Sequence, residues 1–283
     1  MKLRCRERWL DLDHTVVMGV LNVTPDSFSD GGRWLDENAA VAHAAEMIQQ
    51  GAGALDVGGE STRPGAAPVP EDEELHRVLP VVERLAEQFD VPISIDTRKL
   101  SVARRCVESG ASIINDTLGE AAVRGMDEVA SDTGAAIIVM HSRGSPETMT
   151  TLTEYADVVA EVAGFLRARA GDLERAGVAH ESIVLDPGFG FAKTPIQNLE
   201  ILKALDTILE IGYPVLVGTS RKSFIGKILD LPTEQRLEAT GATVAWGVMK
   251  GAHIVRVHDV EPIVRVVRMI EAIHNPSAFS ALG

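Results

Sequence analysis

Short apolar runs recur along this chain, and a polar residue follows nearly every one. The first clear run covers residues 16–20, and Asn22 follows it closely, ahead of a stretch at 24–32 that contains mainly Thr, Pro, Asp, Ser and Gly. An apolar run bounded by turn-forming residues predicts a buried strand. The pattern therefore predicts a strand that delivers a polar side chain to the loop at its C-terminal end. Asn22 is a candidate site residue.

The pattern occurs eight times, with stretches of helical periodicity between the apolar runs. Residues 38–50, for example, place apolar side chains on one face, and Gly51 follows where the helix should stop. The predicted strands are residues 16–20, 54–57, 93–96, 112–115, 135–140, 183–186, 215–218 and 253–257. The predicted helices are residues 38–50, 71–87, 100–109, 121–131, 155–176, 197–209, a region that extends to residue 250, and 262–274.

Eight strand–helix units in 283 residues predict one α/β domain with the (β/α)8 fold, a TIM barrel. Parallel strands need helical crossovers, and eight such units close on themselves. A doubly wound open sheet is the alternative, but the first strand–helix turn lacks the G-x-G-x-x-G pattern of dinucleotide-binding sheets. The chain also has no linker rich in Pro, Gly or Ser. We predict an N-terminal cover at residues 1–15, the barrel at 16–276 and a C-terminal tail at 277–283.

Composition and charge narrow the class of protein. An apolar fraction of 45% is sufficient for a large core. No apolar run approaches the roughly 18 residues of a membrane span, and the N-terminus lacks a signal-peptide segment, so we expect a cytoplasmic protein with no membrane partner. The net charge of -14 disfavours a nucleic-acid surface. The two cysteines, Cys5 and Cys106, match no metal or redox spacing.

Polar side chains gather at the ends of the predicted strands. Active sites of (β/α)8 barrels lie at the C-terminal ends of the strands, because the strand–helix loops meet there. Polar residues at many strand ends should therefore face one common pocket. The candidates are Asn22, Asp56, Asp96, Asn115, His141, Asp186, Arg221, Lys222, Arg256 and His258.

Seven longer segments are distinctive in sequence. They are GVLNVTPDSFSDGG, DVGGESTRPGA, SIDTRK, IIND, LDPGFGFAKT, VGTSRKSFIG and RVHDV. In this order they resemble the signature segments of the dihydropteroate synthase family, the pterin-binding TIM barrels of the folate pathway. The resemblance implies a transferase that joins 6-hydroxymethyl-7,8-dihydropterin pyrophosphate to 4-aminobenzoate, giving 7,8-dihydropteroate and pyrophosphate. It also implies Mg2+ as cofactor and a homodimer formed through outer barrel helices.

The resemblance assigns a pterin site to the strand ends. A pterin presents two parallel N–H donors that one carboxylate can accept, and Asp186 resembles the family's residue for this task. Asp96 resembles the residue that stabilises the pterin cation left after C–O cleavage. The predicted catalytic residues are Asp96, Lys222 and Arg256. The predicted pterin-binding residues are Asp96, Asn115, Met140, Asp186, Lys222 and Arg256.

The resemblance assigns other residues to the leaving group and to the second substrate. The predicted pyrophosphate-binding residues are Asn22, Thr62, Arg63, Arg256 and His258. Asn22 offers Mg2+ the kind of oxygen ligand that this ion prefers. Ser223 starts a predicted helix, where free N–H groups favour the carboxylate of 4-aminobenzoate. The predicted 4-aminobenzoate-binding residues are Phe28, Pro64, Phe191, Lys222 and Ser223.

Several candidates have structural interpretations as well. Asp56 could equally accept hydrogen bonds from loop amides, so we leave it out of the predicted site. Asp96 could orient its neighbours instead of contacting a cation. We interpret His141 as a hydrogen-bonded loop histidine and Asp259 as a capping or orienting residue. Ala192 replaces a glycine found in many relatives, which matters only if the loop needs a positive φ at this position.

Two other classes of function remain open at this point. A non-catalytic barrel relative would be expected to have lost part of the Thr62, Arg63 and Lys222 set, which this chain retains. A phosphate-binding aldolase or isomerase would use Lys222 as a Schiff-base lysine. Arg221 beside it favours a hydrogen-bonding role over that of a desolvated amine. Borohydride trapping with a carbonyl substrate would separate the two.

Overall fold

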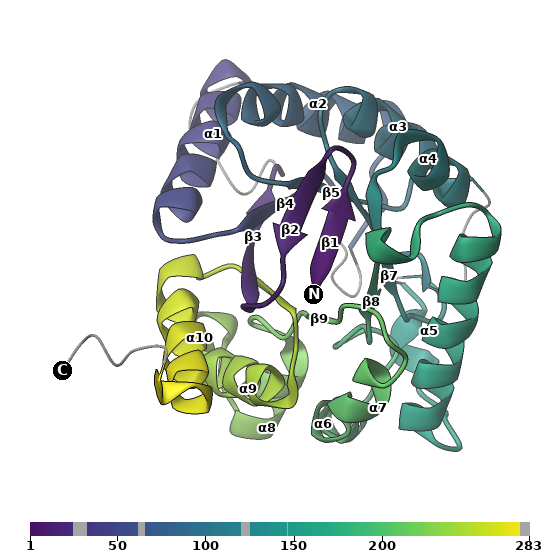
Figure 1. Ribbon diagram of the computed structural model, residues 1–283, viewed down its shortest axis with the longest axis vertical. Helices are drawn as coiled ribbons and strands as arrows, with labels where there is room; N and C mark the ends of the chain where they lie inside the picture. The colour runs from purple at the N-terminus through teal and green to yellow at the C-terminus, as the bar shows by residue number, and fades with distance from the viewer. Residues whose placement is uncertain (25–32, 62–65, 120–124, 146, 278–283) are drawn as a thin grey trace.

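Eight parallel strands form the centre of the molecule (Figure 1). The computed structural model describes residues 1–24, 33–61, 66–119, 125–145 and 147–277. Within these residues the strands are hydrogen-bonded in the order β8-β7-β6-β5-β4-β3-β10-β9, and a parallel bridge between Leu185 and Val215 joins the two ends of the sheet. This confirms the predicted (β/α)8 barrel. The strands are β3 (Val16–Asn22), β4 (Ala54–Gly58), β5 (Ile93–Thr97), β6 (Ile113–Asp116), β7 (Ala136–Met140), β8 (Ile183–Asp186), β9 (Leu216–Val217) and β10 (Ile254–Val257).

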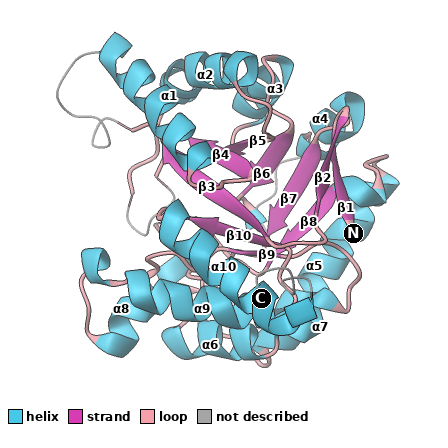
Figure 2. Cartoon of the chain, turned by 60° about the vertical axis from the view of Figure 1, so that its left-hand side comes forward, coloured by secondary structure: helices cyan, strands magenta, loops and turns pink. Residues whose placement is uncertain are grey.

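Helices cover the outside of the strands, as Figure 2 shows. None of the helices in the described part of the chain is long and apolar enough to cross a membrane. Short 3-10 helices lie at Met149–Thr151, His180–Ser182 and Thr233–Gln235. The α-helices are α1 (Arg33–Gln49), α2 (Glu71–Gln88), α3 (Leu100–Glu108), α4 (Met126–Thr133), α5 (Val158–Arg175), α6 (Pro195–Lys203), α7 (Leu205–Leu209), α8 (Ser223–Leu229), α9 (Leu237–Lys250) and α10 (Val260–His274).

Some predicted helices have different boundaries in the structure. The predicted helix 197–209 is divided at Ala204 into α6 and α7. The helical region that extends to residue 250 is divided into α8 and α9, because Asp230 ends α8 in a left-handed conformation with φ 54°. The predicted helix 155–176 begins only at Val158, because the Asp157 carboxylate accepts two backbone hydrogen bonds at 3.0 Å and caps the first turn.

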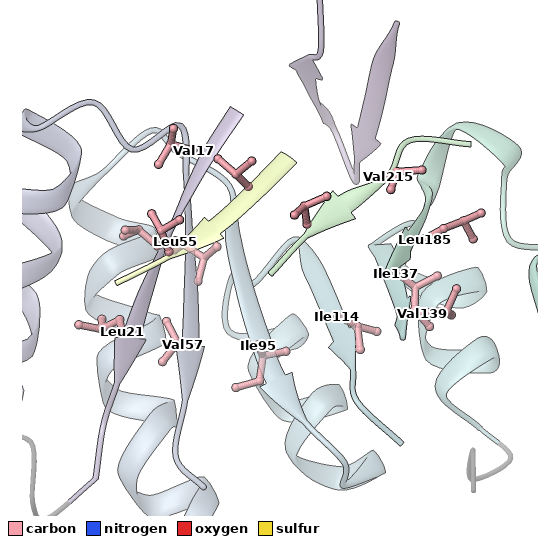
Figure 3. Packing of buried hydrophobic residues seen from close by; sticks show 14 of the residues in the cluster. Val17, Leu21, Leu55, Val57, Ile95, Ile114, Ile137, Val139, Leu185 and Val215 are labelled. Carbon is pink, nitrogen blue, oxygen red and sulfur yellow. The ribbon is translucent and has the colours of Figure 1, made fainter. Parts of the chain in front are cut away.

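Alternation along the strands separates core residues from site residues. Figure 3 shows apolar side chains such as Leu55, Ile95 and Ile114, which belong to the large cluster between the strands and the helices. Successive side chains of a strand point to opposite faces, so the neighbours of these residues lie inside the barrel. The polar and soft side chains placed inside in this way are Asp56, Asp96, Asn115, Met140, Asp186 and Arg256.

An antiparallel hairpin covers the end of the barrel opposite the candidate site. It consists of β1 (Lys2–Cys5) and β2 (Arg8–Asp11), which lie across the strands in Figure 1. Leu3 and Cys5 are completely buried against barrel-interior residues, including Ala136 at the start of β7. The Arg6 N–H donates to the carbonyl oxygen of Gly134 at 2.8 Å. A ligand therefore has access to the interior from the C-terminal ends of the strands.

Candidate active site

Arg256 lies between two carboxylates inside the barrel. Its Nε donates to Asp56 Oδ2 at 2.5 Å, and one terminal nitrogen donates to Asp96 Oδ2 at 2.7 Å. Burial alone would disfavour the charged guanidinium, but Asp56 and Asp96 outweigh it and raise the pKa of Arg256. The arginine therefore stays charged and has one fixed orientation, because two carboxylates from β4 and β5 hold the guanidinium of β10.

Asp56 has a larger role than the sequence indicated. It is completely buried in β4, and its Oδ2 accepts hydrogen bonds from Arg256 and, at 3.1 Å, from Asn115 Nδ2. The interpretation of Asp56 as an acceptor for loop amides is wrong, because the side chain points into the barrel. Its position one residue after Leu55 in an alternating strand was the signal for this orientation. Asp56 thus orients two predicted pterin-binding residues at once.

Asn115 and Asp96 lie side by side, paired in register between β5 and β6. One hydrogen bond to Asp56 fixes the Asn115 amide, while its Oδ1 is buried and has no partner in the described residues. Burial raises the pKa of Asp96 to about 7, although Arg256 opposes this shift. Near neutral pH the site therefore offers an amide oxygen without a partner and a carboxyl group that is close to its titration point.

Asp186 and Met140 form a second register pair, between β8 and β7. Asp186 Oδ1 accepts a hydrogen bond from the Gly188 N–H at 2.7 Å. Burial raises the pKa of Asp186, while the Gly188 amide, Lys222, Lys193 and Arg256 act in the opposite direction. The side chain of Met140 is buried with Phe191 in a small apolar cluster beside this carboxylate. The arrangement combines one oriented carboxylate with an apolar surface.

Lys222 and Phe191 bring two further loops to the site. Lys222 Nζ lies 4.1 Å from the centroid of the Phe191 ring, which is a cation–π contact. A Cβ at Gly190 would lie 3.0 Å from Lys222 Cδ, so the glycine leaves room for the lysine stem. Ser223 is the first residue of the seven-residue helix α8. Lys222, Ser223 and Phe191, all predicted to contact the aryl substrate, therefore come from the loops after β9 and β8.

His258 lies at the end of β10 and is neutral at physiological pH. Burial lowers its pKa to about 3, and Arg256, Arg221 and Lys222 add to the shift. The Ser220 hydroxyl accepts from the His258 backbone N–H at 3.2 Å and lies 3.0 Å from Nδ1 of the ring. Asp259 next to it accepts two hydrogen bonds from Arg221, at 2.9 and 2.5 Å. Asp259 thus orients Arg221 and makes no capping hydrogen bond to α10.

The remaining predicted residues fall into two groups. Phe28, Thr62, Arg63 and Pro64 lie outside the described residues. Asn22 ends β3, and its side chain makes no hydrogen bond to a described residue. No group of three His, Cys, Asp or Glu side chains in the described part of the chain could hold a metal ion.

The loop after β8 contains a strained residue, Ala192. Ala192, an L residue in a loop rich in glycine, has φ 49°. The loop therefore does need a positive φ here. The Tyr155 hydroxyl donates to the Ala192 carbonyl oxygen at 2.9 Å and helps to hold this conformation. The interpretation of His141 as a hydrogen-bonded histidine holds for only one of its ring nitrogens, because Nε2 has no partner in the described residues.

Oriented carboxylates, an amide and cations at the C-terminal end of a (β/α)8 barrel are typical of an enzyme that binds a small polar ring. Residues 18–258 match the pterin binding enzyme family. A Bacillus subtilis dihydropteroate synthase is 50% identical over 263 residues, which are 93% of this chain and 90% of that protein. The chain therefore belongs to the pterin-binding enzyme family and, within it, to the dihydropteroate synthases.

Solved structures agree with this assignment. The dihydropteroate synthase of Yersinia pestis, in a complex with a sulfonamide drug, superimposes with a TM-score of 0.91 at 43% identity, covering 97% of this chain and 99% of that one. The Xanthomonas albilineans dihydropteroate synthase with 4-aminobenzoic acid gives a TM-score of 0.90 at 42% identity, covering 97% and 98%. The family match at residues 18–258 contains all the predicted site residues, from Asn22 to His258.

Proposed function

We propose that this chain condenses 6-hydroxymethyl-7,8-dihydropterin pyrophosphate with 4-aminobenzoate to give 7,8-dihydropteroate and pyrophosphate, in folate biosynthesis. The observation that carries the proposal is the set of buried groups around Arg256, in which Asn115 Oδ1 and Asp56 Oδ1 have no partner among the described residues. Buried polar atoms without partners are costly unless a ligand completes them. The relatives with this activity support the same ligand, a pterin.

The pterin would bind between the two register pairs of the barrel. Asp186 would accept the ring N–H and the exocyclic amine, since a carboxylate matches two parallel donors. The Asn115 amide oxygen would accept a further hydrogen bond from the ring, and Met140 would lie against an apolar part of it. Lys222 would donate to the pterin carbonyl, and the Arg256 guanidinium would stack on the ring face.

Bond breaking and bond making would then take place above Asp96. The C–O bond breaks and its electron pair leaves with pyrophosphate, and the amine nitrogen of 4-aminobenzoate forms the new C–N bond and loses a proton. The positive charge left on the pterin carbon would lie near the Asp96 carboxylate, which stabilises it most when ionised. Asp96 held beside Arg256, with a pKa near neutrality, suits this task.

The leaving pyrophosphate would bind at the ends of β3 and β10. The Ser220 hydroxyl can donate to His258 Nδ1, which leaves the ring proton on Nε2 as a donor to a phosphate oxygen. Thr62 and Arg63 would complete this set. Asn22 fits Mg2+, because its side chain makes no hydrogen bond to a described residue and Mg2+ commonly binds one or two protein oxygens together with water and phosphate. The bound ion would neutralise charge on the departing pyrophosphate.

The second substrate would bind at the rim, beside Phe191. Its ring would pack on Phe191 together with Phe28 and Pro64, and its carboxylate would face Ser223 and Lys222. Lys222 already lies over the Phe191 ring, so an anion placed there would meet a positive charge. We further propose that the protein is a cytoplasmic homodimer. Exposed apolar side chains on the adjacent helices α9 and α10 are available for such an interface: Trp246, Met249, Met269 and Ile273.

The experiment that tests the proposed function is a pyrophosphate-release assay. The purified chain would receive the pterin pyrophosphate with Mg2+, with and without 4-aminobenzoate, and the product would be identified by mass. We expect release of pyrophosphate and formation of dihydropteroate. Lys222→Met should abolish turnover, whereas Lys203→Met, an exposed lysine on α6, should not. Absence of dihydropteroate with the unaltered chain would reject the proposal, and light scattering would test the dimer.

A further inference from the structure

Lys193 is a buried lysine between the loops that follow β7 and β8. Only 9% of its surface is exposed. Its Nζ lies 2.9 Å from the carbonyl oxygens of Gly188 and Phe191, 3.2 Å from the carbonyl oxygen of His141 and 3.0 Å from the Nδ1 of the same histidine. Four acceptors therefore surround an ammonium group that has three N–H donors, so each donor has an acceptor within reach. Its charge is therefore placed where acceptors of two loops converge.

These contacts connect two loops that carry proposed ligand-binding residues. Met140 ends β7 directly before His141, and Asp186 ends β8 two residues before Gly188. Phe191 belongs to the second of these loops. Lys193 thus contacts the backbone close to a proposed pterin-binding residue in each loop, Met140 or Asp186. It also contacts the backbone of Phe191, a proposed contact of the aryl substrate.

Gly188 links Lys193 to the Asp186 carboxylate. The Gly188 N–H donates to Asp186 Oδ1 at 2.7 Å, while the Gly188 carbonyl oxygen accepts from Lys193. Gly188 has φ 70°, and a Cβ built there would lie 1.9 Å from the His141 carbonyl oxygen, so only glycine fits. With no side chain of its own to pack, the position of Gly188 depends on these backbone contacts.

The loop needs such an anchor because its backbone is strained. Gly188, Gly190 and Ala192 all have positive φ, and for the alanine this conformation is unfavourable. Lys193 follows the strained alanine directly and holds the carbonyl oxygens of Gly188 and Phe191 on either side of Gly190. Without the ammonium group, the Gly188 carbonyl oxygen would keep its hydrogen bond from the Phe191 N–H at 3.1 Å but lose the one that ties it to the His141 and Phe191 carbonyl oxygens.

From this geometry we infer that Lys193 is a positioning residue for the pterin site. Its ammonium group holds the Gly188 amide in place, and that amide orients the Asp186 carboxylate toward the pterin. The inference rests on the proposed function, because it takes Asp186 to be the acceptor for the pterin donors. Lys193 itself does not contact the substrate in this arrangement; it acts through Gly188.

The charges around the site support this role. Burial raises the pKa of Asp186, and the Gly188 amide, Lys222, Lys193 and Arg256 oppose the shift. Lys193 therefore also helps to keep the carboxylate ionised, the form that accepts two hydrogen bonds. Burial, with Lys193 and Arg143, lowers the pKa of His141 to about 2, so its neutral Nδ1 remains available to Lys193.

The first test measures pterin binding directly, by calorimetry with free 6-hydroxymethylpterin. Lys193→Met should weaken binding about ten- to a hundred-fold, the range expected when charged hydrogen bonds are lost. Removal of one cation near Asp186 should also move the acidic loss of affinity to higher pH. Lys193→Gln keeps two N–H donors but no charge, so it should show the same pH shift with a smaller loss. Unchanged affinity and pH dependence in both variants would overturn the inference.

A chemical rescue separates the charge from the packing of the stem. Alkylation of Lys193→Cys with 2-bromoethylamine restores an ammonium on a chain of lysine's length, whereas 1-iodopropane gives a neutral chain of the same length. Because position 193 is itself buried, the alkylation is carried out in urea on a chain that also carries Cys5→Ala and Cys106→Ala, and the protein is refolded before binding is measured. Only the aminoethylated protein should regain pterin affinity. Equal recovery with both reagents would contradict a role for the ammonium.

The matched control is Tyr155→Phe. It removes a hydrogen bond to Ala192 in the same loop but leaves the contacts of Gly188 intact. Pterin affinity should stay within about two-fold of that of the unaltered chain, a change of less than about 0.5 kcal/mol in binding free energy, because the Gly188 contacts remain. A loss equal to that of Lys193→Met would mean that any loosening of the loop has this effect. If the unaltered chain neither binds pterin nor forms dihydropteroate, the proposed function fails instead.

Discussion

Asp56 and Arg256 are separated by 200 positions in the sequence and form an ion pair at 2.5 Å inside the barrel. The carboxylate is completely buried, and the same oxygen also holds Asn115. Loss of Asp56 would leave the buried Arg256 with Asp96 alone and the Asn115 Nδ2 without its acceptor. Asp56→Ala should therefore destabilise the fold by about 3 to 5 kcal/mol in urea unfolding. Asp206→Ala, which removes an exposed carboxylate near Lys250, should change stability by less than about 1 kcal/mol. Similar effects of both variants would contradict this reading of Asp56.

Activity should depend on the ionisation of Asp96. Its folded-state pKa of about 7 is above the ordinary value of 3.8, so the folded protein holds this proton up to near neutrality. If the ionised carboxylate stabilises the pterin cation, kcat/KM should rise as the pH increases through about 7. Asp96→Asn should lack that rise. The same raised pKa predicts a contribution to stability that is greatest at acid pH and is lost as the pH rises toward 7. Carbon NMR of the carboxyl group would measure the pKa directly.

Pterin affinity should depend strongly on the charge of Asp186. In Asp186→Asn the amide oxygen can still accept the Gly188 hydrogen bond, so folding should barely change. The amide nitrogen, however, would face a pterin donor, with a loss of about 2 to 4 kcal/mol of binding free energy. Calorimetry with a pterin measures this loss, and thermal unfolding provides the control. Normal pterin affinity in the variant would remove Asp186 from the site.

The pyrophosphate set should distinguish two forms of the pterin substrate. Arg63→Ala and His258→Ala should weaken binding of the pterin pyrophosphate much more than binding of the free hydroxymethylpterin, because only the former makes phosphate contacts. Because the pKa of His258 is lowered to about 3, the ring stays neutral from pH 6 to pH 8. Its contribution to binding of the pterin pyrophosphate should therefore not change over this range. Equal losses for both ligands would show that these side chains support structure rather than phosphate binding.

Ala192→Gly should stabilise the protein slightly. Glycine adopts the observed φ of 49° without the penalty that an L side chain meets, and the entropy cost of glycine offsets part of the gain. The expected increase is up to about 1 kcal/mol in the free energy of unfolding. Denaturant titration measures it. A clear decrease would mean that the methyl group, which is buried, contributes more through packing than its conformation costs.

The barrel could be predicted from the sequence because its signals are local. Each apolar run and each polar strand end is read over a few residues, and all eight strands were expected at nearly the observed positions. The site was harder where contacts join distant segments. The sequence does not show the role of Asp56, because its partners, Arg256 and Asn115, are far away in sequence. Lys193 gave no signal, because its role depends on the backbone path of two loops. The roles of Phe28, Thr62, Arg63 and Pro64 stay predictions.

The alternation of side chains along each strand also limits how this barrel can change in evolution. Deletion of one residue from β6 would turn Asn115 toward the helices and bring an apolar neighbour into the interior. The site would lose a ligand and the core would gain a buried amide in one event. A substitution in a strand affects either the site or the core, whereas a change in strand length affects both. Insertions and deletions should therefore survive only in the loops, and the spacing within each strand should be preserved even where its residues are replaced.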